Sequence, residues 1–143
     1  MSYVVHYTWQ DFDSAIDFLV RRLPANTMRE QGFHIYGEPR GGLPLAVALS
    51  HYLDLPIAHS IYGPGILWVD DIVDRGVTYK GRYNECAAAG IRFVGAVWVT
   101  KLGLPDVMAC AVAADPEAWI VFPWENRERV EADRADFEKR RAG

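Results

Sequence analysis

Three aspartates stand close together in the stretch ILWVDDIVDRGVT, which covers residues 66–78. Asp70 and Asp71 follow an apolar run that is typical of a buried strand, and Asp74 comes three residues later. Acids are favoured at the start of a helix by its dipole, but that effect explains one or two acids and not an adjacent pair after a buried strand. Adjacent carboxylates suit the vicinal hydroxyls of a sugar or a hydrated divalent cation, and both interpretations stay open at this point.

The residues after the acids are suited to a phosphate. Arg75, Gly76, Val77 and Thr78 would present backbone N–H groups and a hydroxyl at the start of a helix, which is a common anion site. The glycine lets the backbone come close to the ligand. Acids for a sugar and amides for a phosphate together predict a sugar-phosphate site.

A second loop with anion-binding chemistry lies in IYGEPRGGLPLA, residues 35–46. Arg40, Gly41 and Gly42 separate an apolar strand from a helix, and backbone amides beside a guanidinium suit a diphosphate. Taken alone, the same residues also fit an ordinary Gly-Pro turn with a surface arginine.

The elements that must position these loops alternate between strands and helices. Alternation of this kind predicts an α/β fold with a mainly parallel twisted sheet flanked by helices, in which ligands bind at the carboxyl ends of the strands. Thr8 and Asp11 form a capping box before the first helix. We expect strands at 3–7, 32–37, 66–69, 93–100, 107–113 and 119–122, a short strand within 55–63, and helices at 12–23, 42–53, 77–90 and along the charged tail.

Length, composition and charge exclude several classes of protein. With 143 residues, half of them hydrophobic, the chain is predicted to form a single domain. The net charge of −4 argues against general nucleic-acid binding, which requires a basic face. The two cysteines lack metal-ligand spacing, and we see neither a signal peptide nor an apolar run that could span a bilayer. We therefore expect a soluble, cytoplasmic protein that binds neither nucleic acid nor membrane.

The stretch from Ile66 to Thr78 resembles the signature of the type I phosphoribosyltransferases, which has a hydrophobic strand, two acids, a loop and a phosphate cradle. The loop of Arg40 and Gly41 is similar to the diphosphate loop of the purine branch, which includes the bacterial xanthine-guanine enzymes. In that branch the residue before the glycines often has an unusual peptide geometry. The motif Asp-Asp-x-x-Asp also occurs in prenyl-transferring enzymes, but there it lies on a helix of an all-helical fold.

The resemblance also implies a base pocket. In the xanthine-guanine branch a lysine after the corresponding strand approaches the purine 6-oxo group, an aromatic ring stacks on the purine, and the next backbone group reads the base edge. These roles carry over to Lys101, Trp119 and Ile120. A lysine donor suits a 6-oxo acceptor and not a 6-amino donor, so guanine, xanthine or hypoxanthine is favoured over adenine. The implied organisation is a core at about 32–113, a hood at about 114–125 with the N-terminal segment, and a charged helix at 126–143.

The reaction implied by the resemblance is displacement of diphosphate from phosphoribosyl diphosphate (PRPP) by a purine nitrogen. Asp70 and Asp71 would hold the ribose and Mg²⁺, and Asp74 would be the catalytic residue that handles the purine N7 proton. Arg40 and Gly41 would bind the diphosphate, and residues 75–78 would bind the 5′-phosphate. The expected partners are PRPP, a purine base and further copies of the chain.

Two departures from the family pattern leave an alternative open. Arg75 replaces the usual threonine of the phosphate cradle. The segment before Ile66 is only about IYGPG long, whereas the family has a mobile loop here that closes over the site and excludes water. Either another element such as the tail or a neighbouring subunit covers the site, or catalysis is slow and leaky. A third alternative is a non-catalytic regulator that binds PRPP or a nucleotide.

Overall fold

The computed structural model describes residues 2–103 and 108–142, apart from a few side chains near the C-terminus. The chain forms two compact units, which are named here the sheet unit (residues 15–114) and the terminal unit (residues 1–14 and 115–143). Val107, the first residue of one predicted strand, lies outside the described residues. No helix in the described ranges is long and apolar enough to cross a membrane.

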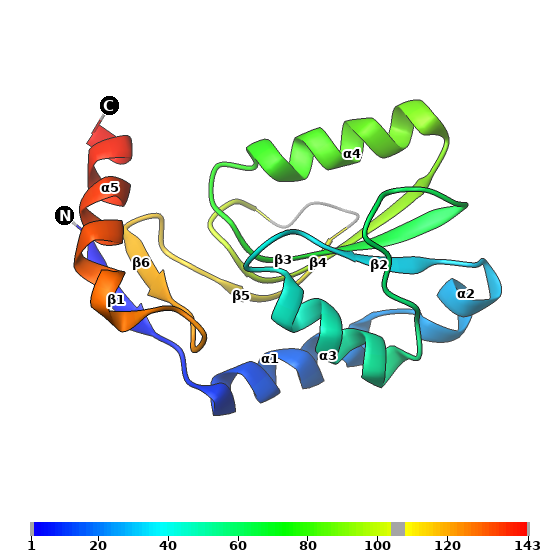
Figure 1. Ribbon diagram of the computed structural model, residues 1–143, viewed down its shortest axis with the longest axis horizontal. Helices are drawn as coiled ribbons and strands as arrows, with labels where there is room; N and C mark the ends of the chain where they lie inside the picture. The colour runs from blue at the N-terminus through cyan, green and yellow to red at the C-terminus, as the bar shows by residue number, and fades with distance from the viewer. Residues whose placement is uncertain (1, 104–107, 143) are drawn as a thin grey trace. The chain divides into compact units, whose positions relative to one another are not determined.

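The sheet unit is built on four parallel strands, which confirms the predicted fold class. Their order is β2-β3-β4-β5, with β2 at His34–Gly37, β3 at Gly65–Val73, β4 at Arg92–Thr100 and β5 at Met108–Ala113. Helix α4 (Val77–Ala89) lies on one side of this sheet and helix α3 (Leu43–Leu53) on the other (Figure 1). The side chains of Trp68 and Val97 are fully buried beneath α4.

Local signals in the sequence set most helix ends. The capping box before α1 (Trp9–Arg22) is confirmed, since the Thr8 backbone N–H donates to Asp11 Oδ2 at 2.8 Å and the Asp11 N–H donates to Thr8 Oγ1 at 3.1 Å. Helix α4 ends at Gly90 as predicted, with φ at +72°, the left-handed conformation that glycine adopts without steric cost.

The structure differs from the sequence-based expectation in three places. The chain does not leave helical structure after Pro24, because a second helix, α2 (Ala25–Glu30), begins directly after it. The short strand expected within 55–63 is reduced to an isolated bridge between Ile57 and Ile35. Strand β3 does not stop at Val69 but continues to Val73, because β4 pairs with it over that whole length.

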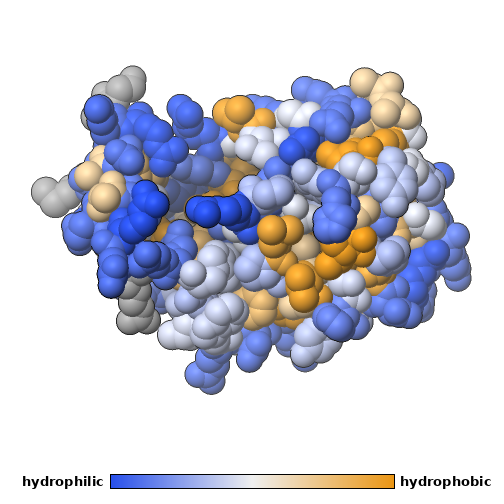
Figure 2. All heavy atoms as spheres, in the orientation of Figure 1, coloured by the Kyte–Doolittle hydropathy of each residue, from blue (hydrophilic) through white to orange (hydrophobic). Residues whose placement is uncertain are grey.

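The terminal unit joins the two ends of the described chain. Strand β1 (Tyr3–His6) pairs in parallel with β6 (Ala118–Val121), followed by a 3₁₀ turn (Arg127–Arg129) and helix α5 (Val130–Ala142). Arg134 on α5 donates from Nη2 to the Ser2 carbonyl at 2.8 Å, which ties α5 to the start of the chain. Hydrophilic residues cover most of the part of the surface in Figure 2 that holds α5, consistent with its predicted solvent-facing charges.

Candidate functional site

The two adjacent carboxylates lie where β3 loses one of its neighbours. Strand β2 pairs with β3 only as far as Val69, whereas β4 pairs with Asp70 and beyond. The prediction that the acids follow the end of the strand is therefore wrong in detail, although they do stand at the carboxyl end of β2. Both side chains are half-buried, and the Asp71 N–H donates to Asp70 Oδ1 at 2.8 Å. This edge of the sheet carries a fixed acidic pair.

Burial and mutual repulsion disfavour ionisation of the acidic pair. Burial raises the pKa of Asp70 to about 9, and repulsion from Asp71 adds to the effect. Burial also raises the pKa of Asp71. Among the described side chains, none forms an ion pair with either carboxylate. Burial and mutual repulsion therefore favour the protonated form of the pair, and a bound cation would compete with that proton.

The loop after β2 lies directly against this pair. A Cβ atom placed on Gly41 would collide with the Asp71 carboxylate, so a larger residue at this position would push that side chain aside. A Cβ on Gly42 would come 2.8 Å from the Glu38 backbone nitrogen. The peptide bond between Pro39 and Arg40 is cis, and Arg40 is exposed. The structure thus brings the predicted diphosphate loop and one of the predicted acids into contact.

The start of α4 has the features of an anion site. Gly76 is its N-cap with φ at +81°, and no side chain caps the first turn. Val77 and Thr78 are exposed, whereas Gly76 is buried. Arg75 is exposed beside them. Three of the four residues predicted to bind a 5′-phosphate are therefore accessible at the N-terminus of a helix, where backbone N–H groups lack partners within the helix.

Two further predicted residues meet at the ends of β3 and β4. Lys101 Nζ lies 3.7 Å from Asp74 Oδ1, and the lysine side chain is only 3% exposed against 38% for the aspartate. The Lys101 N–H also donates to the Val73 carbonyl at 2.9 Å, which continues the pairing of the two strands. The candidate proton acceptor and the candidate 6-oxo donor are thus side by side.

Trp119 and Ile120 belong to the terminal unit. Both lie on β6, where Ile120 is buried and the Trp119 ring centroid is 5.0 Å from that of Phe137 on α5. The Trp119 Nε1 atom is buried and has no hydrogen-bond partner among the residues that the structure describes. Trp119 also lines a cavity of about 440 Å³ whose other lining residues are Glu125, Asp133, Asp136, Lys139 and Arg140. Their base-binding roles stay predictions.

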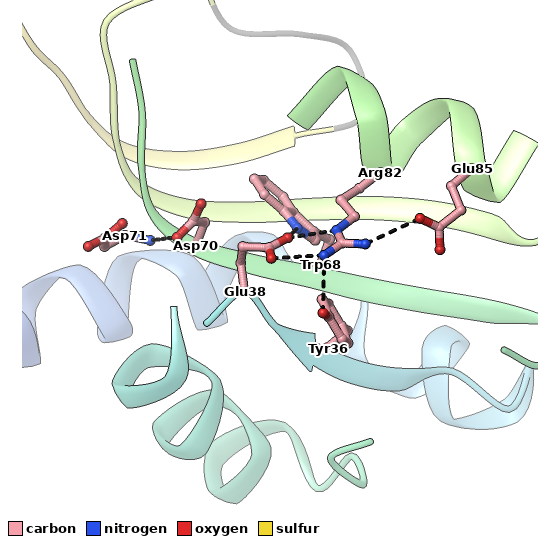
Figure 3. Close-up of polar contacts among 7 residues, drawn as sticks. All are labelled: Tyr36, Glu38, Trp68, Asp70, Asp71, Arg82 and Glu85. Carbon is pink, nitrogen blue, oxygen red and sulfur yellow. Dashed lines mark hydrogen bonds and ion pairs between the residues drawn. The ribbon is translucent and has the colours of Figure 1, made fainter. Parts of the chain in front are cut away.

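Sequence reasoning missed a polar cluster at the centre of the sheet unit (Figure 3). The buried Glu38 carboxylate accepts hydrogen bonds from Trp68 Nε1 at 3.0 Å and from Arg82 Nε at 2.8 Å. Burial opposes ionisation of Glu38, but the hydrogen bonds from Arg82 and Trp68 outweigh it and lower the pKa of this carboxyl. A tryptophan inside a buried strand was the available signal, because its N–H requires a partner.

No protein-family model and no curated protein matches the chain. Solved structures do. A purine phosphoribosyltransferase from Pyrococcus horikoshii superposes with a TM-score of 0.67 and 28% identity, covering 86% of this chain and 95% of that one. The chain has the fold of the type I phosphoribosyltransferases.

Two more structures extend the same fold comparison. The xanthine-guanine-hypoxanthine phosphoribosyltransferase of Helicobacter pylori is 21% identical with a TM-score of 0.64, over 97% of this chain and 99% of that one. A hypothetical protein from Neisseria gonorrhoeae with bound ppGpp is 19% identical with a TM-score of 0.70, over 94% of this chain and 96% of that one. The type I phosphoribosyltransferase fold therefore accounts for nearly the whole chain.

Proposed function

We propose that this protein transfers the phosphoribosyl group of PRPP to a 6-oxopurine and releases diphosphate. The observation that carries the proposal is the contact between the Gly41 loop and the Asp71 carboxylate. This contact brings a backbone loop that suits a diphosphate next to a carboxylate that suits sugar hydroxyls or a metal ion. PRPP carries its diphosphate and a hydroxyl on adjacent carbons of the ribose. The similarity to the Pyrococcus purine enzyme supports phosphoribosyl transfer in general.

The acidic pair fits Mg²⁺. Asp70 and Asp71 are adjacent, half-buried and raised in pKa, and Mg²⁺ is commonly held by one or two carboxylates together with substrate phosphates. When bound, Mg²⁺ supplies positive charge next to the departing diphosphate. The Arg40 guanidinium and the loop amides would stabilise the same leaving group, and the α4 start at Gly76–Thr78 would orient the 5′-phosphate.

The pairing of Lys101 with Asp74 supports a 6-oxopurine. The ammonium is a donor and the carboxylate an acceptor, and they are 3.7 Å apart. A 6-oxopurine carrying its proton on N7 presents an acceptor and a donor at adjacent positions of one edge. Adenine would place its 6-amino donor against the lysine donor instead. Asp74 would accept the N7 proton as the new bond to the ribose forms.

The test is a base screen with PRPP and Mg²⁺, in which nucleotide formation is followed with guanine, xanthine, hypoxanthine, adenine, uracil and orotate. We expect turnover with at least one 6-oxopurine and a loss of about 100-fold or more in Asp74→Asn. Asp17→Asn is the matched control, since Asp17 is an exposed residue on α1 with a side chain 64% accessible. Turnover with adenine alone would contradict the base assignment.

A second candidate is a non-catalytic protein that binds PRPP or a nucleotide. Residues 58–64 lead from the bridge at Ile57 directly into β3, so no long segment leaves this part of the sheet to exclude water. The Neisseria protein that shares the fold holds ppGpp. Mg²⁺-dependent PRPP binding that is lost in Asp70→Ala/Asp71→Ala, with no turnover of any base, would favour this candidate.

Self-association stays a prediction. Helix α3 is apolar on its outer side as well as its inner one, with Leu43 42% and Val47 49% exposed. Hydrophobic residues also gather over the middle of the sheet unit on the face shown in Figure 2. Sedimentation of the wild type against Val47→Glu would test whether α3 pairs with a second copy.

A further inference from the structure

A single carboxylate links three elements of the sheet unit. Glu38 follows β2, Trp68 lies on β3 and Arg82 lies on α4. Arg82 contacts both Glu38 oxygens, from Nε to Oε1 at 2.8 Å and from Nη2 to Oε2 at 3.0 Å. This two-bond arrangement fixes the orientation of the guanidinium as well as its distance.

The guanidinium is also held from its outer side. Arg82 Nη2 lies 3.3 Å from the Tyr36 hydroxyl, and Nη1 lies 3.2 Å from Glu85 Oε1. The guanidinium carbon is 5.2 Å from the centre of the Tyr36 ring. Only 29% of the Arg82 side chain and 12% of the Glu38 side chain are exposed, so solvent screens the pair weakly. Figure 3 shows these side chains converging between β2, β3 and α4.

Each linked element carries one part of the proposed site. The Glu38 N–H donates to the Val69 carbonyl at 2.8 Å, and the Glu38 carbonyl accepts from the Gly42 N–H at 2.9 Å, so Glu38 anchors both ends of the diphosphate loop. Trp68 is two residues before Asp70 on β3, which places both on one face of the strand. Arg82 lies on α4 little more than one turn beyond its phosphate-binding start.

We propose that Arg82 is a positioning residue which, through Glu38, fixes the separation between the diphosphate loop and the start of α4. The inference rests on the proposed function, because it assigns one anionic group of PRPP to each of these two segments. A rigid separation favours a ligand whose two anionic groups are joined by one ribose. Ligands that have only one of these groups gain nothing from it.

A fixed separation predicts that PRPP gains affinity because both anionic groups belong to one molecule, and this gain in affinity can be measured. Of the two anion-binding segments, ribose 5-phosphate engages only the α4 start, diphosphate engages only the loop, and PRPP engages both. When two segments are held at the right distance, binding of the second group benefits from a high effective concentration. Loosening the separation lowers that benefit and leaves the two single-group affinities nearly unchanged.

The experiment is calorimetric titration of the whole chain with Mg²⁺ and each of the three ligands. In Arg82→Met we expect PRPP affinity to fall about 10-fold or more, while ribose 5-phosphate and diphosphate each change by less than about 3-fold. Arg21→Met is the matched control, because it makes the same replacement at an arginine on α1 whose side chain is 73% exposed. Its three affinities should match those of the wild type.

Arg82→Lys keeps the positive charge and the long side chain but loses the two-bond contact. It should fall between the wild type and Arg82→Met in PRPP affinity, and it replaces Arg82→Met in the comparison if that variant does not fold. An equal loss for all three ligands in either variant would mean that Arg82 only stabilises the fold, and the inference would be wrong. Wild-type protein that binds none of the three ligands would overturn the proposed function as well.

Discussion

The acidic pair should make this protein less stable as the pH rises, and Asp70→Asn should remove most of that effect. The pKa of Asp70 is raised from 3.8 to about 9 by burial and by Asp71. Between these values the folded chain binds a proton that the unfolded chain does not. Stability is therefore highest below about pH 4 for this group and declines as the pH rises towards about 9.

The magnitude follows from the number of pH units crossed. One extra proton in the folded state costs about 1.4 kcal/mol of stability per pH unit, so the interval from about pH 5 to about pH 8 has a ceiling of about 4 kcal/mol. Because the pair is only half-buried, we expect the measured difference to be about 2 kcal/mol. For a chain of 143 residues this corresponds to a shift in Tm of about 6 °C.

The assay is urea unfolding of the wild type, Asp70→Asn and the exposed control Asp17→Asn across this pH range. All other titrating groups are shared, so the difference between wild type and Asp70→Asn isolates the acidic pair. The asparagine variant should be more stable than the wild type at about pH 8 and close to it at about pH 5. Parallel pH profiles for wild type and Asp70→Asn would refute the reasoning, because Asp70 would then ionise normally in the folded protein.

Three other changes each act on one contact of the site. Excess Mg²⁺ should raise the Tm of the wild type more at about pH 8 than at about pH 6, since metal and proton compete, and this difference should vanish in Asp70→Asn. Gly41→Ala should weaken PRPP binding about 10-fold or more in titration, because its Cβ would collide with Asp71. Gly81→Ala on α4 is the control, because its Cβ meets no atom within 4 Å. Its free energy of unfolding in urea should rise by about 0.5–1 kcal/mol. Arg82→Met should lower the free energy of unfolding by about 3 kcal/mol in urea, because the buried Glu38 carboxylate is left without its cation. A loss below about 1 kcal/mol would contradict the argument from burial.

Short-range signals explain most of what the sequence predicted correctly. The capping box at Thr8 and the glycine at residue 90 act within one turn of a helix, so both could be predicted without knowing the fold. The expectation that Asp70 and Asp71 lie where ligands bind follows from the rule that parallel strands place ligands at their carboxyl ends, although the structure puts both acids within β3, beside the end of β2. The contact of Gly41 with Asp71 follows from the same rule.

What the sequence did not reveal depends on partners that are distant along the chain. Strand β3 extends to Val73 because β4 pairs with it, and a single-strand pattern contains no information on the length of a neighbour. Glu38 and Arg82 meet across 44 positions, and each one alone resembles an ordinary surface charge. Pro24 reads as a helix end, which it is, but the immediate start of α2 depends on burial of Met28.

The parallel pairing of β1 with β6 determines the order in which the chain can fold during synthesis. Strand β1 is made before the sheet unit, yet its partner at Ala118–Val121 is made only after that whole unit. Strand β1 therefore has no β6 to pair with until Val121 has been synthesised. The segment YVVH is rich in residues that favour strands, so during that interval it can pair with another polypeptide.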